Sequence, residues 1–459
     1  MAFDALTLTC FKAYDIRGRL GDELNEDIAY RIGRAFAQVL GAKRVVLGRD
    51  VRPTSDSLGQ AVARGLMACG VEVLDLGLSG TEETYFAVTH LGADGGICVT
   101  ASHNPMDYNG MKMVRAGSAP IGKAEGMAEI QALAETGEFA PEIDGGTVVD
   151  ASGTRDAYVE KLLEFVEIDA LKPLKILVNA GNGAAGPSFD ALADGLAAAG
   201  APLQFVRMHH DPDGSFPNGI PNPLLDENQP VTADAVVAEG ADMGVAWDGD
   251  FDRCFFFDHE GGFIPGEYVV ALLAEAFLAK ESGAKIIHDP RIIWATQDIV
   301  ARMGGEAIQS QCGHSNIKQV MRDTGAVYGG EMSAHHYFRD FMACDSGMIP
   351  WLLVAELVSR RGESLKDLVA ELRCSYPSSG ERNFRVDDAK AMIAKIDTAY
   401  GAAAKDRDET DGLSLSFGDW RFNLRASNTE PLLRLNIESK GDPALVQTKL
   451  AEMQDLIQS

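Results

Sequence analysis

The chain has 459 residues, of which 46% are hydrophobic and 24% charged, so its composition is that of a globular protein rather than a disordered one. Its 41 basic and 68 acidic side chains give a formal net charge of −27, which argues against a non-specific nucleic-acid binder and against anionic membrane surfaces but allows a local basic pocket for a small anion. This length corresponds to about three domains, and two or four would also fit.

The sequence shows none of the usual features of a membrane or secreted protein. The nearest candidate for a transmembrane helix, Tyr268–Ala279, is interrupted by Glu275 and falls short of the roughly 18 residues required. Asp4 comes early, and no basic segment precedes an apolar core as it would in a secretory signal. The cysteines include no C-x-x-C pair, which argues against a zinc knuckle or a disulfide framework. We therefore expect reduced thiols in a cytoplasmic protein.

Three segments share one pattern, in which a β-branched run leads into a loop of small or charged residues and then into a helical stretch. The runs are Val45–Leu47, Ile176–Val178 and Ile286–His288, and their starts lie about 110 to 130 residues apart, which suggests three related α/β units. Apolar strands that alternate with helices favour mixed sheets covered on both faces.

The C-terminal part follows a different pattern. Leu413–Phe417 and Trp420–Asn423 are expected to form paired strands, followed by a strand at Leu432–Ile437 and a terminal helix near Pro443–Ile457. The fold class is therefore three related α/β domains with mixed sheets plus a C-terminal α+β domain. Candidate linkers at Ala140–Gly153 and Ser375–Gly380, and a turn after Phe257, divide the chain into domains 1–150, 151–257, 258–374 and 375–459.

The first loop that could carry chemistry is Thr100–Pro105. It follows the apolar strand Gly96–Val99, so Ser102 is expected at the carboxyl end of a strand, where open α/β sheets bind ligands. The chain contains no G-x-S-x-G, which argues against an esterase nucleophile. Taken alone, Ser102 is better explained as a turn residue ahead of Asn104 and Pro105.

Two glycine-rich segments partly match nucleotide-binding patterns. Gly181–Gly186 fits G-x-G-x-x-G after an expected strand, but the next strand ends in Arg207 rather than in an acidic residue, which favours a tight turn and leaves dinucleotide binding as an alternative. Gly117–Ala124 matches a P-loop except that Ala124 lacks the hydroxyl for Mg²⁺ and Pro120 lacks a backbone donor. Nucleotide hydrolysis at that segment is not expected.

Asp248, Asp250 and Asp252 alternate along a short loop and give the strongest metal signal. The apolar runs Met243–Trp247 and Phe255–Phe257 flank this loop, so the carboxylates are expected to be buried. Each close pair of buried carboxylates costs roughly 1 kcal/mol or more unless a cation lies among them. Ligands that are all oxygen suit Mg²⁺, and we prefer this interpretation to a solvated acidic loop.

Two further polar loops follow expected strands. Gly330–His336 comes after the apolar run Ala326–Tyr328, and its residues Glu331 and Ser333 alternate, so both could bind sugar hydroxyls, while only one of its adjacent histidines would share their face. Arg425–Pro431 offers an arginine fork and several hydroxyl and amide donors that suit a phosphate, although a polar hairpin loop explains it equally well.

Taken in order, these loops resemble the four signature loops of the α-D-phosphohexomutase superfamily: T-A-S-H-N-P (serine), D-G-D-x-D-R (metal), G-E-M-S-G-H (sugar) and R-x-S-N-T-x-P (phosphate). Here they are Thr100–Pro105, Asp248–Arg253, Gly330–His335 and Arg425–Pro431. The segments Phe11–Gly18 and Pro212–Pro217 also resemble family segments, and the sequences of Asp248–Phe257 and Gly330–Phe338 look most like those of bacterial phosphomannomutases that serve GDP-mannose synthesis.

The chain departs from the family pattern at three places. Phe251 and Ala334 stand where many members have glycine, and Arg291 falls where relatives often have lysine. No nucleophile or metal-ligand position is altered.

The resemblance implies four domains around a central cleft and a phosphoryl transfer between O6 and O1 of a hexose. Ser102 would carry the phosphoryl group and donate it to form a hexose 1,6-bisphosphate, which serves as intermediate and activator. Asp248, Asp250 and Asp252 would hold Mg²⁺ with Ser102, and Arg17, Lys112 and His335 would be the other catalytic residues. The implied substrate-binding residues are Tyr14, Arg253, Arg291, His314, Glu331, Ser333, Arg425, Ser427, Asn428 and Thr429.

The implied activity is that of a phosphomannomutase, which interconverts mannose 6-phosphate and mannose 1-phosphate. Glu331 and Ser333 would contact hydroxyls shared by mannose and glucose, so a phosphoglucomutase or a dual-specificity enzyme is an alternative. From a different class, Gly181–Gly186 leaves open an NAD(P)-dependent oxidoreductase. A non-catalytic sugar-phosphate-binding protein is a fourth hypothesis. The expected partners are hexose phosphates, not nucleic acid or membranes, and the expected state is a monomer or homodimer.

Overall fold

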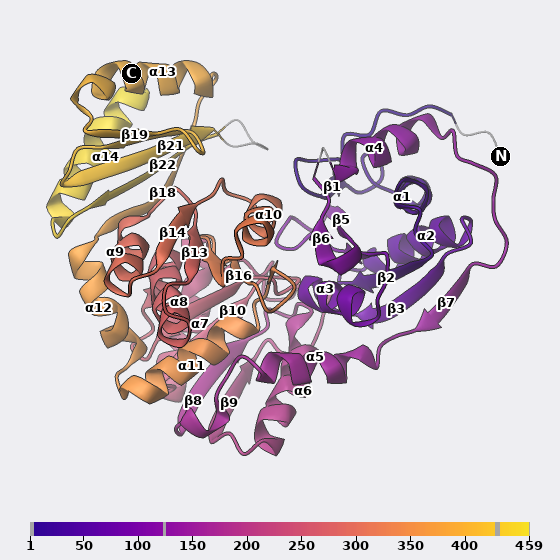
Figure 1. The fold of residues 1–459 in the computed structure, drawn as a ribbon, viewed down its shortest axis with the longest axis horizontal. Helices are drawn as coiled ribbons and strands as arrows, with labels where there is room; N and C mark the ends of the chain where they lie inside the picture. The colour runs from indigo at the N-terminus through magenta and orange to yellow at the C-terminus, as the bar shows by residue number, and fades with distance from the viewer. Residues whose placement is uncertain (1–3, 123–124, 427–431, 459) are drawn as a thin grey trace. The chain divides into compact units, whose positions relative to one another are not determined.

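The structure is a computed structural model that describes residues 4–122, 125–426 and 432–458 (Figure 1). Within these ranges the chain forms two compact units. The first unit comprises residues 4–263 together with 337–362, and the second comprises 264–336 together with 363–458. Each unit is described by itself below.

The first unit begins with a mixed sheet whose strands run in the order β1–β5–β4–β2–β3–β7, with β6 paired to β5. Strands β2, β3, β4 and β7 are parallel, whereas β5 is antiparallel to β4, β1 and β6. The strands are β1 (Ile16–Arg19), β2 (Arg44–Arg49), β3 (Glu72–Leu78), β4 (Gly95–Val99), β5 (Tyr108–Arg115), β6 (Ala119–Pro120) and β7 (Thr147–Asp150). The associated helices are α1 (Glu26–Leu40), α2 (Ser55–Met67), α3 (Thr81–His90), η1 (Ala116–Ser118) and α4 (Met127–Thr136).

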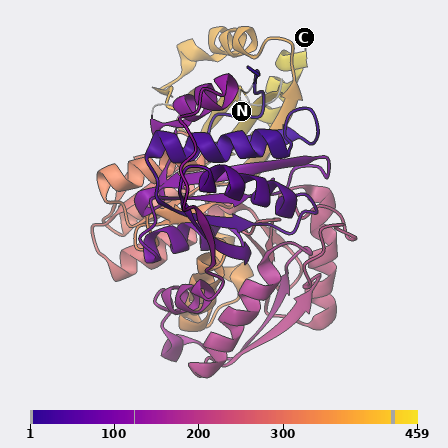
Figure 2. The ribbon, with the colours of Figure 1, turned by 90° about the vertical axis from the view of Figure 1, so that its right-hand side faces the viewer.

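Helices cover both faces of this sheet because its strands are apolar on both sides. Helices α1 and α2 pack side by side, as the indigo pair in Figure 2 shows, and they bury Val45 and Leu47 of β2 on one face. On the other face Val46 lies close to Val88 of α3, and both flank Gly96. Parallel strands buried on both faces were the pattern expected from the sequence.

A second mixed sheet in the same unit has the order β12–β11–β10–β8–β9. Strand β10 is parallel to β8 and antiparallel to β11. Its strands are β8 (Leu174–Asn179), β9 (Leu203–Met208), β10 (Met243–Trp247), β11 (Cys254–Asp258) and β12 (Phe263–Ile264). The helices of this part are α5 (Thr154–Leu163), η3 (Ile168–Ala170), α6 (Ala185–Ala198), η4 (Asp226–Asn228), α7 (Gln229–Glu239) and α11 (Ile349–Arg361). Strands β16 (His336–Phe338) and β17 (Cys344–Asp345) pair antiparallel ahead of α11.

The second unit contains parallel strands in the order β14–β13–β15 and an antiparallel sheet in the order β18–β22–β21–β20–β19. The parallel strands are β13 (Lys285–His288), β14 (Glu306–Gln309) and β15 (Tyr328–Gly330), with helices α8 (Gly266–Lys280), α9 (Trp294–Arg302), α10 (His314–Thr324) and α12 (Leu365–Ser375). The antiparallel sheet comprises β18 (Ser378–Arg385), β19 (Asp406–Asp408), β20 (Leu413–Ser416), β21 (Trp420–Ala426) and β22 (Leu432–Ser439), with α13 (Ala389–Tyr400), η5 (Gly401–Ala403) and α14 (Pro443–Gln458).

These elements confirm the predicted fold class of α/β domains with mixed sheets and a C-terminal α+β domain. The predicted strand Met243–Trp247 and the predicted terminal helix are present. The prediction of Ala140–Gly153 as a linker was wrong in part, because Thr147–Asp150 forms edge strand β7 beside β3. All four residues of β7 are exposed, so no apolar burial pattern marked the strand. Likewise, Ser378 in the other predicted linker already begins β18.

Two further observations bear on the sequence expectations. None of the helices in the described ranges is both long enough and apolar enough to cross a membrane. All seven cysteines lie in those ranges and are unbridged, as expected.

Candidate active site

The loops that follow β4 and β10 meet in the first unit. Gly249 packs directly on the serine loop, because a Cβ at this position would lie 2.6 Å from the carbonyl oxygen of Ser102. Ser102 and Phe251 both have positive φ angles, of 48° and 47°. Such backbone is unfavourable for residues other than glycine and occurs mainly where the surrounding packing enforces it. The two loops therefore hold each other in place.

The Ser102 hydroxyl is 2.5 Å from Asp248 Oδ2 and donates a hydrogen bond to it. Arg253 Nη2 donates to the same hydroxyl at 3.1 Å and to Asp248 Oδ2 at 2.6 Å. The His103 ring nitrogen Nδ1 is 3.0 Å from the hydroxyl and also contacts Arg253. The structure thus brings together a serine and an aspartate that are 146 residues apart in the sequence.

The carboxylates of Asp248, Asp250 and Asp252 lie close together, with one oxygen of each within 4.8 Å of the others. Lys112 Nζ is 2.8 Å from Asp250 Oδ2 and also contacts Asp252. The Oδ1 atoms of Asp248 and Asp250 are buried and accept no hydrogen bond from the described residues. Buried carboxylate oxygens of this kind are the ligands that a hard divalent cation such as Mg²⁺ prefers, so these residues fit the implied metal.

The charges of this cluster are strongly coupled. Burial raises the pKa of Asp248, and it raises that of Asp252 well above its usual range with help from the neighbouring carboxylates. Burial acts in the same direction on Asp250, but the ammonium of Lys112 outweighs it and lowers the pKa of Asp250. Lys112 in turn keeps its proton, because Asp250 and Asp252 raise its pKa against the effect of burial. A divalent cation would allow all three carboxylates to be ionised together.

Two predicted residues near the N-terminus lie on strand β1 or just before that strand. Arg17, on β1, donates to the carbonyl oxygen of Thr100 at 3.0 Å and forms an ion pair with Asp15 at 3.1 Å. Tyr14 is half-buried in the segment that precedes β1. Arg17 therefore adds a cation beside the loop of Ser102.

In the second unit, the predicted sugar-binding residues cluster around Arg291. Arg291 Nη2 lies 2.7 Å from Asp289 Oδ2, 3.5 Å from Glu331 Oε1 and 3.3 Å from Ser333 Oγ. His335 Nδ1 is 3.7 Å from Glu331 Oε2. His314 is the first residue of α10, and the preceding backbone N–H, of Gly313, donates to Glu331 Oε1 at 3.0 Å.

Only one of the two adjacent histidines joins this cluster, as the sequence predicted. His336 is fully buried, and its Nδ1 is 2.7 Å from the hydroxyl of Tyr328. Burial lowers its pKa to about 3, so it is a neutral core residue at physiological pH.

Arg425, from the predicted phosphate loop, lies on β21 directly opposite Arg434 on β22. Like charges in this position repel each other. Glu381 of β18 offsets the repulsion, because its carboxylate is 2.9 Å from Arg425 and 3.3 Å from Arg434. The predicted residues Ser427, Asn428 and Thr429 lie outside the described residues.

Some neighbours of the reacting groups were not predicted from the sequence. Thr81, at the start of α3, donates through its hydroxyl to Asp250 Oδ2 at 2.6 Å. His103 and Glu381 also contact predicted site residues. His103 could have been found, because it is the titratable member of the serine loop. Thr81 and Glu381 carry no comparable local signal.

The glycines of Gly181–Gly186 are explained by close backbone packing. A Cβ on Gly183 would lie 2.8 Å from the carbonyl oxygen of Gly249, and one on Gly186 would lie 2.1 Å from that of His210. The N–H of Ala184 donates to the Gly249 oxygen at 3.0 Å. This turn therefore supports the aspartate loop, as the tight-turn interpretation predicted. The P-loop-like segment reaches residues 123–124, which lie outside the described ranges.

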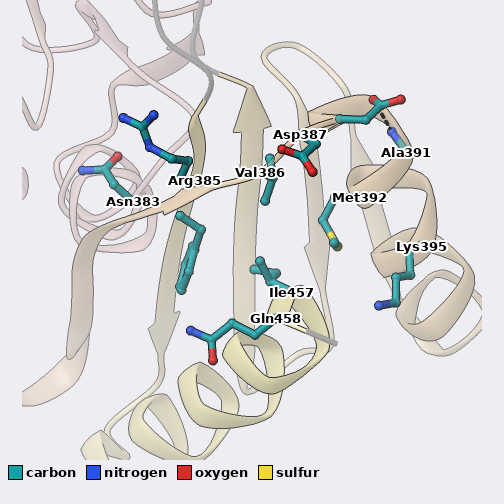
Figure 3. Close-up of a pocket in the computed structure, with 11 residues that line it drawn as sticks. Asn383, Arg385, Val386, Asp387, Ala391, Met392, Lys395, Ile457 and Gln458 are labelled. Carbon is teal, nitrogen blue, oxygen red and sulfur yellow. Dashed lines mark hydrogen bonds between the residues drawn. The ribbon is translucent and has the colours of Figure 1, made fainter.

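A groove of about 750 Å³ lies in the second unit between the end of β18, helix α13 and the end of α14 (Figure 3). Arg385, Asp387, Met392, Lys395 and Ile457 are among its lining residues. Asp388 at its rim accepts a hydrogen bond from the backbone N–H of Ala391 and so caps α13. None of the described residues predicted for catalysis or binding lines this groove.

Four protein-family models together match most of the chain. Models of phosphoglucomutase/phosphomannomutase α/β/α domains I, II and III match residues 9–141, 156–262 and 265–376, and the C-terminal domain model matches 381–456.

Curated relatives and solved structures agree with these matches. A phosphomannomutase from Salmonella montevideo is 58% identical over 98% of this chain and 99% of its own length. A Xanthomonas campestris protein named "Phosphohexose mutases" is 56% identical over 98% of this chain and 100% of its own. The crystal structure of a phosphoglucomutase/phosphomannomutase family protein from Burkholderia thailandensis superimposes with a TM-score of 0.86 at 33% identity, covering 98% and 97% of the two chains.

Proposed function

The chain belongs to the phosphoglucomutase/phosphomannomutase family, and from this premise we propose that it is a phosphomannomutase that interconverts mannose 6-phosphate and mannose 1-phosphate. The observation that carries the proposal is the buried Ser102 hydroxyl, held between Asp248 and Arg253 beside the aspartate cluster. Full-length relatives named phosphomannomutase support it.

Ser102 Oγ carries the transferring phosphoryl group in this proposal. The bond between phosphorus and Ser102 Oγ breaks as phosphorus bonds to a hydroxyl oxygen of the hexose monophosphate, which loses its proton and becomes a 1,6-bisphosphate. The other phosphate of that molecule then returns to Ser102. Such transfer depends mainly on positioning and on neutralising charge. Arg253 and Lys112 are buried cations paired with the aspartates, and Arg17 on β1 donates to the Thr100 carbonyl oxygen of the serine loop.

Asp248, Asp250 and Asp252, with Ser102, would hold Mg²⁺ in this site. When bound, the ion would neutralise charge on the transferring phosphate. Lys112 is paired to two of these aspartates and would share them with the ion.

The remaining predicted residues are proposed to bind substrate. Glu331 and Ser333 would take sugar hydroxyls, His335 would move the hydroxyl proton, and Arg291 and Arg425 would contribute positive charge for the phosphate that does not react. Tyr14, His314, Ser427, Asn428 and Thr429 would add further contacts. A four-domain arrangement around a central cleft, and a monomeric or homodimeric state, stay predictions.

Dual specificity is the second candidate function. It is favoured because the Xanthomonas relative is named for phosphohexoses in general, and because Glu331 and Ser333 would read hydroxyls common to mannose and glucose. A comparison of kcat/KM for mannose 1-phosphate and glucose 1-phosphate separates the two candidates.

Replacement of Ser102 tests the proposal. We expect Ser102→Ala to lower turnover of mannose 1-phosphate by more than about 1,000-fold, because no group is left to carry phosphate. Mass spectrometry of the unaltered protein should find phosphate on the peptide that contains Ser102. Ser118→Ala is the matched control, since Ser118 is also buried and also has a positive φ. Normal turnover of Ser102→Ala with bisphosphate activator supplied would refute the assignment.

A further inference from the structure

Arg52 lies between β2 and α2 and is only 3% exposed. Its guanidinium group donates to backbone carbonyl oxygens of the loop that carries Ser102. Nη2 donates to the oxygen of Ser102 at 2.9 Å and to that of Asn104, and Nη1 donates to those of Pro105 at 2.9 Å and Tyr108 at 3.1 Å. All four terminal N–H groups of this one side chain are therefore directed to a single loop.

The serine loop needs such support because its backbone is not in a relaxed conformation. Ser102 has a φ of 48°, in the left-handed region that favours glycine. Conformations of this kind persist only where the surroundings over-determine them. Other contacts also hold the loop backbone. Ser102 N–H donates to Thr100 Oγ1 at 2.8 Å, Asn104 N–H donates to the Ala101 oxygen at 2.9 Å, Arg17 donates to the Thr100 oxygen at 3.0 Å, and Gly249 packs against the loop.

Arg52 is itself fixed from two sides. Asp50 Oδ1 accepts from the Arg52 backbone N–H at 2.9 Å and from Ser55 Oγ at 2.5 Å, and Asp50 Oδ2 lies 3.6 Å from Arg52 Nε. On the other side the ring of Phe216 lies against the guanidinium, 5.6 Å from Cζ to the ring centroid. Aromatic faces attract guanidinium groups in this position.

Phe216 belongs to Pro212–Pro217, a segment that the proposed reaction leaves without a role. Gly214 lets this segment approach the chain around Arg52, because a Cβ there would lie 2.2 Å from the oxygen of Val51. Phe216 has a φ of 46°, and Asp213 N–H donates to the oxygen of Asn182 at 2.9 Å. The segment is therefore tethered to the glycine turn that also supports the aspartate loop.

From these contacts we infer that Arg52 is a positioning residue for Ser102. The segment Pro212–Pro217 in turn holds the Arg52 guanidinium in place through the ring of Phe216. The Arg52 guanidinium donates to loop carbonyls and makes no hydrogen bond or ion pair with the hydroxyl of Ser102 or with Asp248, Asp250 and Asp252. Its effect is on the direction in which Ser102 Oγ points toward Asp248 and Arg253. The inference rests on the proposed function of Ser102.

The test compares Arg52→Lys with Arg34→Lys. Arg34 is the matched control because it is also buried, lies over the ring of Phe139 at 4.8 Å and donates to the carbonyl oxygen of Ala140, away from the serine loop. Lysine keeps the charge but cannot fork to several carbonyls. We expect Arg52→Lys to lower kcat by roughly 10- to 100-fold with KM for mannose 1-phosphate unchanged, since small misplacements of a reacting atom have effects of this size. Arg34→Lys should leave both constants unchanged.

Two further measurements separate positioning from loss of folding. In Arg52→Ala, added guanidinium ion should restore part of kcat, whereas added sodium at the same ionic strength should not. Hydrogen–deuterium exchange in the peptide spanning residues 100–108 should be faster in Arg52→Lys and in Phe216→Leu than in the unaltered protein, and unchanged in Arg34→Lys.

A normal kcat in Arg52→Lys, together with unchanged exchange at residues 100–108, would overturn the inference. A rise in KM at constant kcat would also overturn it, because it would assign Arg52 to substrate binding. If the proposed function failed instead, the unaltered protein would show no mutase activity, while the exchange experiment would still report whether Arg52 holds the loop.

Discussion

Two side chains hold Asp250 through one of its carboxylate oxygens. Its Oδ2 atom is fixed by Thr81 Oγ1 at 2.6 Å and by Lys112 Nζ at 2.8 Å, whereas its Oδ1 atom accepts no hydrogen bond within the part of the chain that the structure describes. Side chains that hydrogen-bond to a metal ligand and orient it typically contribute about 10- to 100-fold to metal affinity. Thr81 and Lys112 therefore aim one oxygen of Asp250 into the cluster.

We predict that Asp250→Asn lowers the affinity for Mn²⁺, used as a paramagnetic substitute for Mg²⁺, by at least about 10-fold, because an amide is a neutral and weaker ligand. Titration followed by electron paramagnetic resonance measures this directly. Asp258→Asn is the control: Asp258 is also buried, on β11, but it accepts from the backbone N–H groups of Glu260 and Gly262. Equal affinities in the two variants would contradict the metal assignment.

The first two residues of helix α3 contact both the aspartate loop and the residues just before helix α11. Thr81, the first residue of α3, contacts Asp250, and the next residue, Glu82, accepts hydrogen bonds from the N–H groups of Gly347 at 2.5 Å and Met348 at 3.2 Å. The hydroxyls of Tyr158 and Ser346 also donate to Glu82. Burial raises the pKa of Glu82 to about 8, against the opposing effect of these hydrogen bonds. One fully buried carboxyl thus links three segments that are distant in sequence.

The raised pKa of Glu82 predicts a pH-dependent stability. Between its unfolded value of 4.5 and its folded value of about 8, the folded protein holds a proton that the unfolded chain has lost, so this contribution to stability falls as pH rises. Glu82→Gln does not titrate, and its amide fits because the hydroxyls of Tyr158 and Ser346 can accept as well as donate. We therefore expect the Tm of Glu82→Gln minus that of the unaltered protein to increase between about pH 5 and pH 8. The opposite trend in calorimetry would mean that the hydrogen bonds keep Glu82 ionised.

At the scale of the whole molecule, the described chain divides into two compact units, and the clustered aspartates, Ser102, Arg253 and Lys112 all belong to the first. The arginines that Glu381 holds together belong to the second. The chain has a net charge of −27, but both proposed phosphate-binding groups contain buried cations. The positive charge is therefore concentrated locally at these two groups.

This division predicts which unit a divalent cation stabilises. We expect calorimetry to resolve two unfolding transitions, and saturating Mg²⁺ to raise the Tm of the first unit alone, by an amount equivalent to about 2.7 kcal/mol at a hundred times the dissociation constant. The transition that Glu82→Gln moves identifies the first unit. At the same Mg²⁺ concentration Asp250→Asn should reduce the shift to about half or less, and a Mg²⁺ shift confined to the other transition would place the cation elsewhere.

Much of the site could be predicted because its loops are local features of the sequence. The serine loop and the aspartate loop each follow a short apolar strand, and Met243–Trp247 forms strand β10 as predicted. The residue types of these loops already indicate carboxylate ligands for a cation and a serine hydroxyl beside them. The alternation in Gly330–His336 likewise predicted that only one of the two histidines would share the face of Glu331 and Ser333, and the structure shows that this one is His335.

The amino-acid sequence by itself determined the fold class, the family resemblance and the loops that bear the reacting groups, because strand periodicity and short loops depend on neighbours along the chain. Tertiary structure alone decided that Arg52 reaches the Ser102 carbonyl across 50 residues, that Thr81 reaches Asp250 across 169, and that exposed Thr147–Asp150 is a strand. Those contacts form where separate loops and sheet edges meet, and the pattern of any one segment does not record which distant backbone will pack against it.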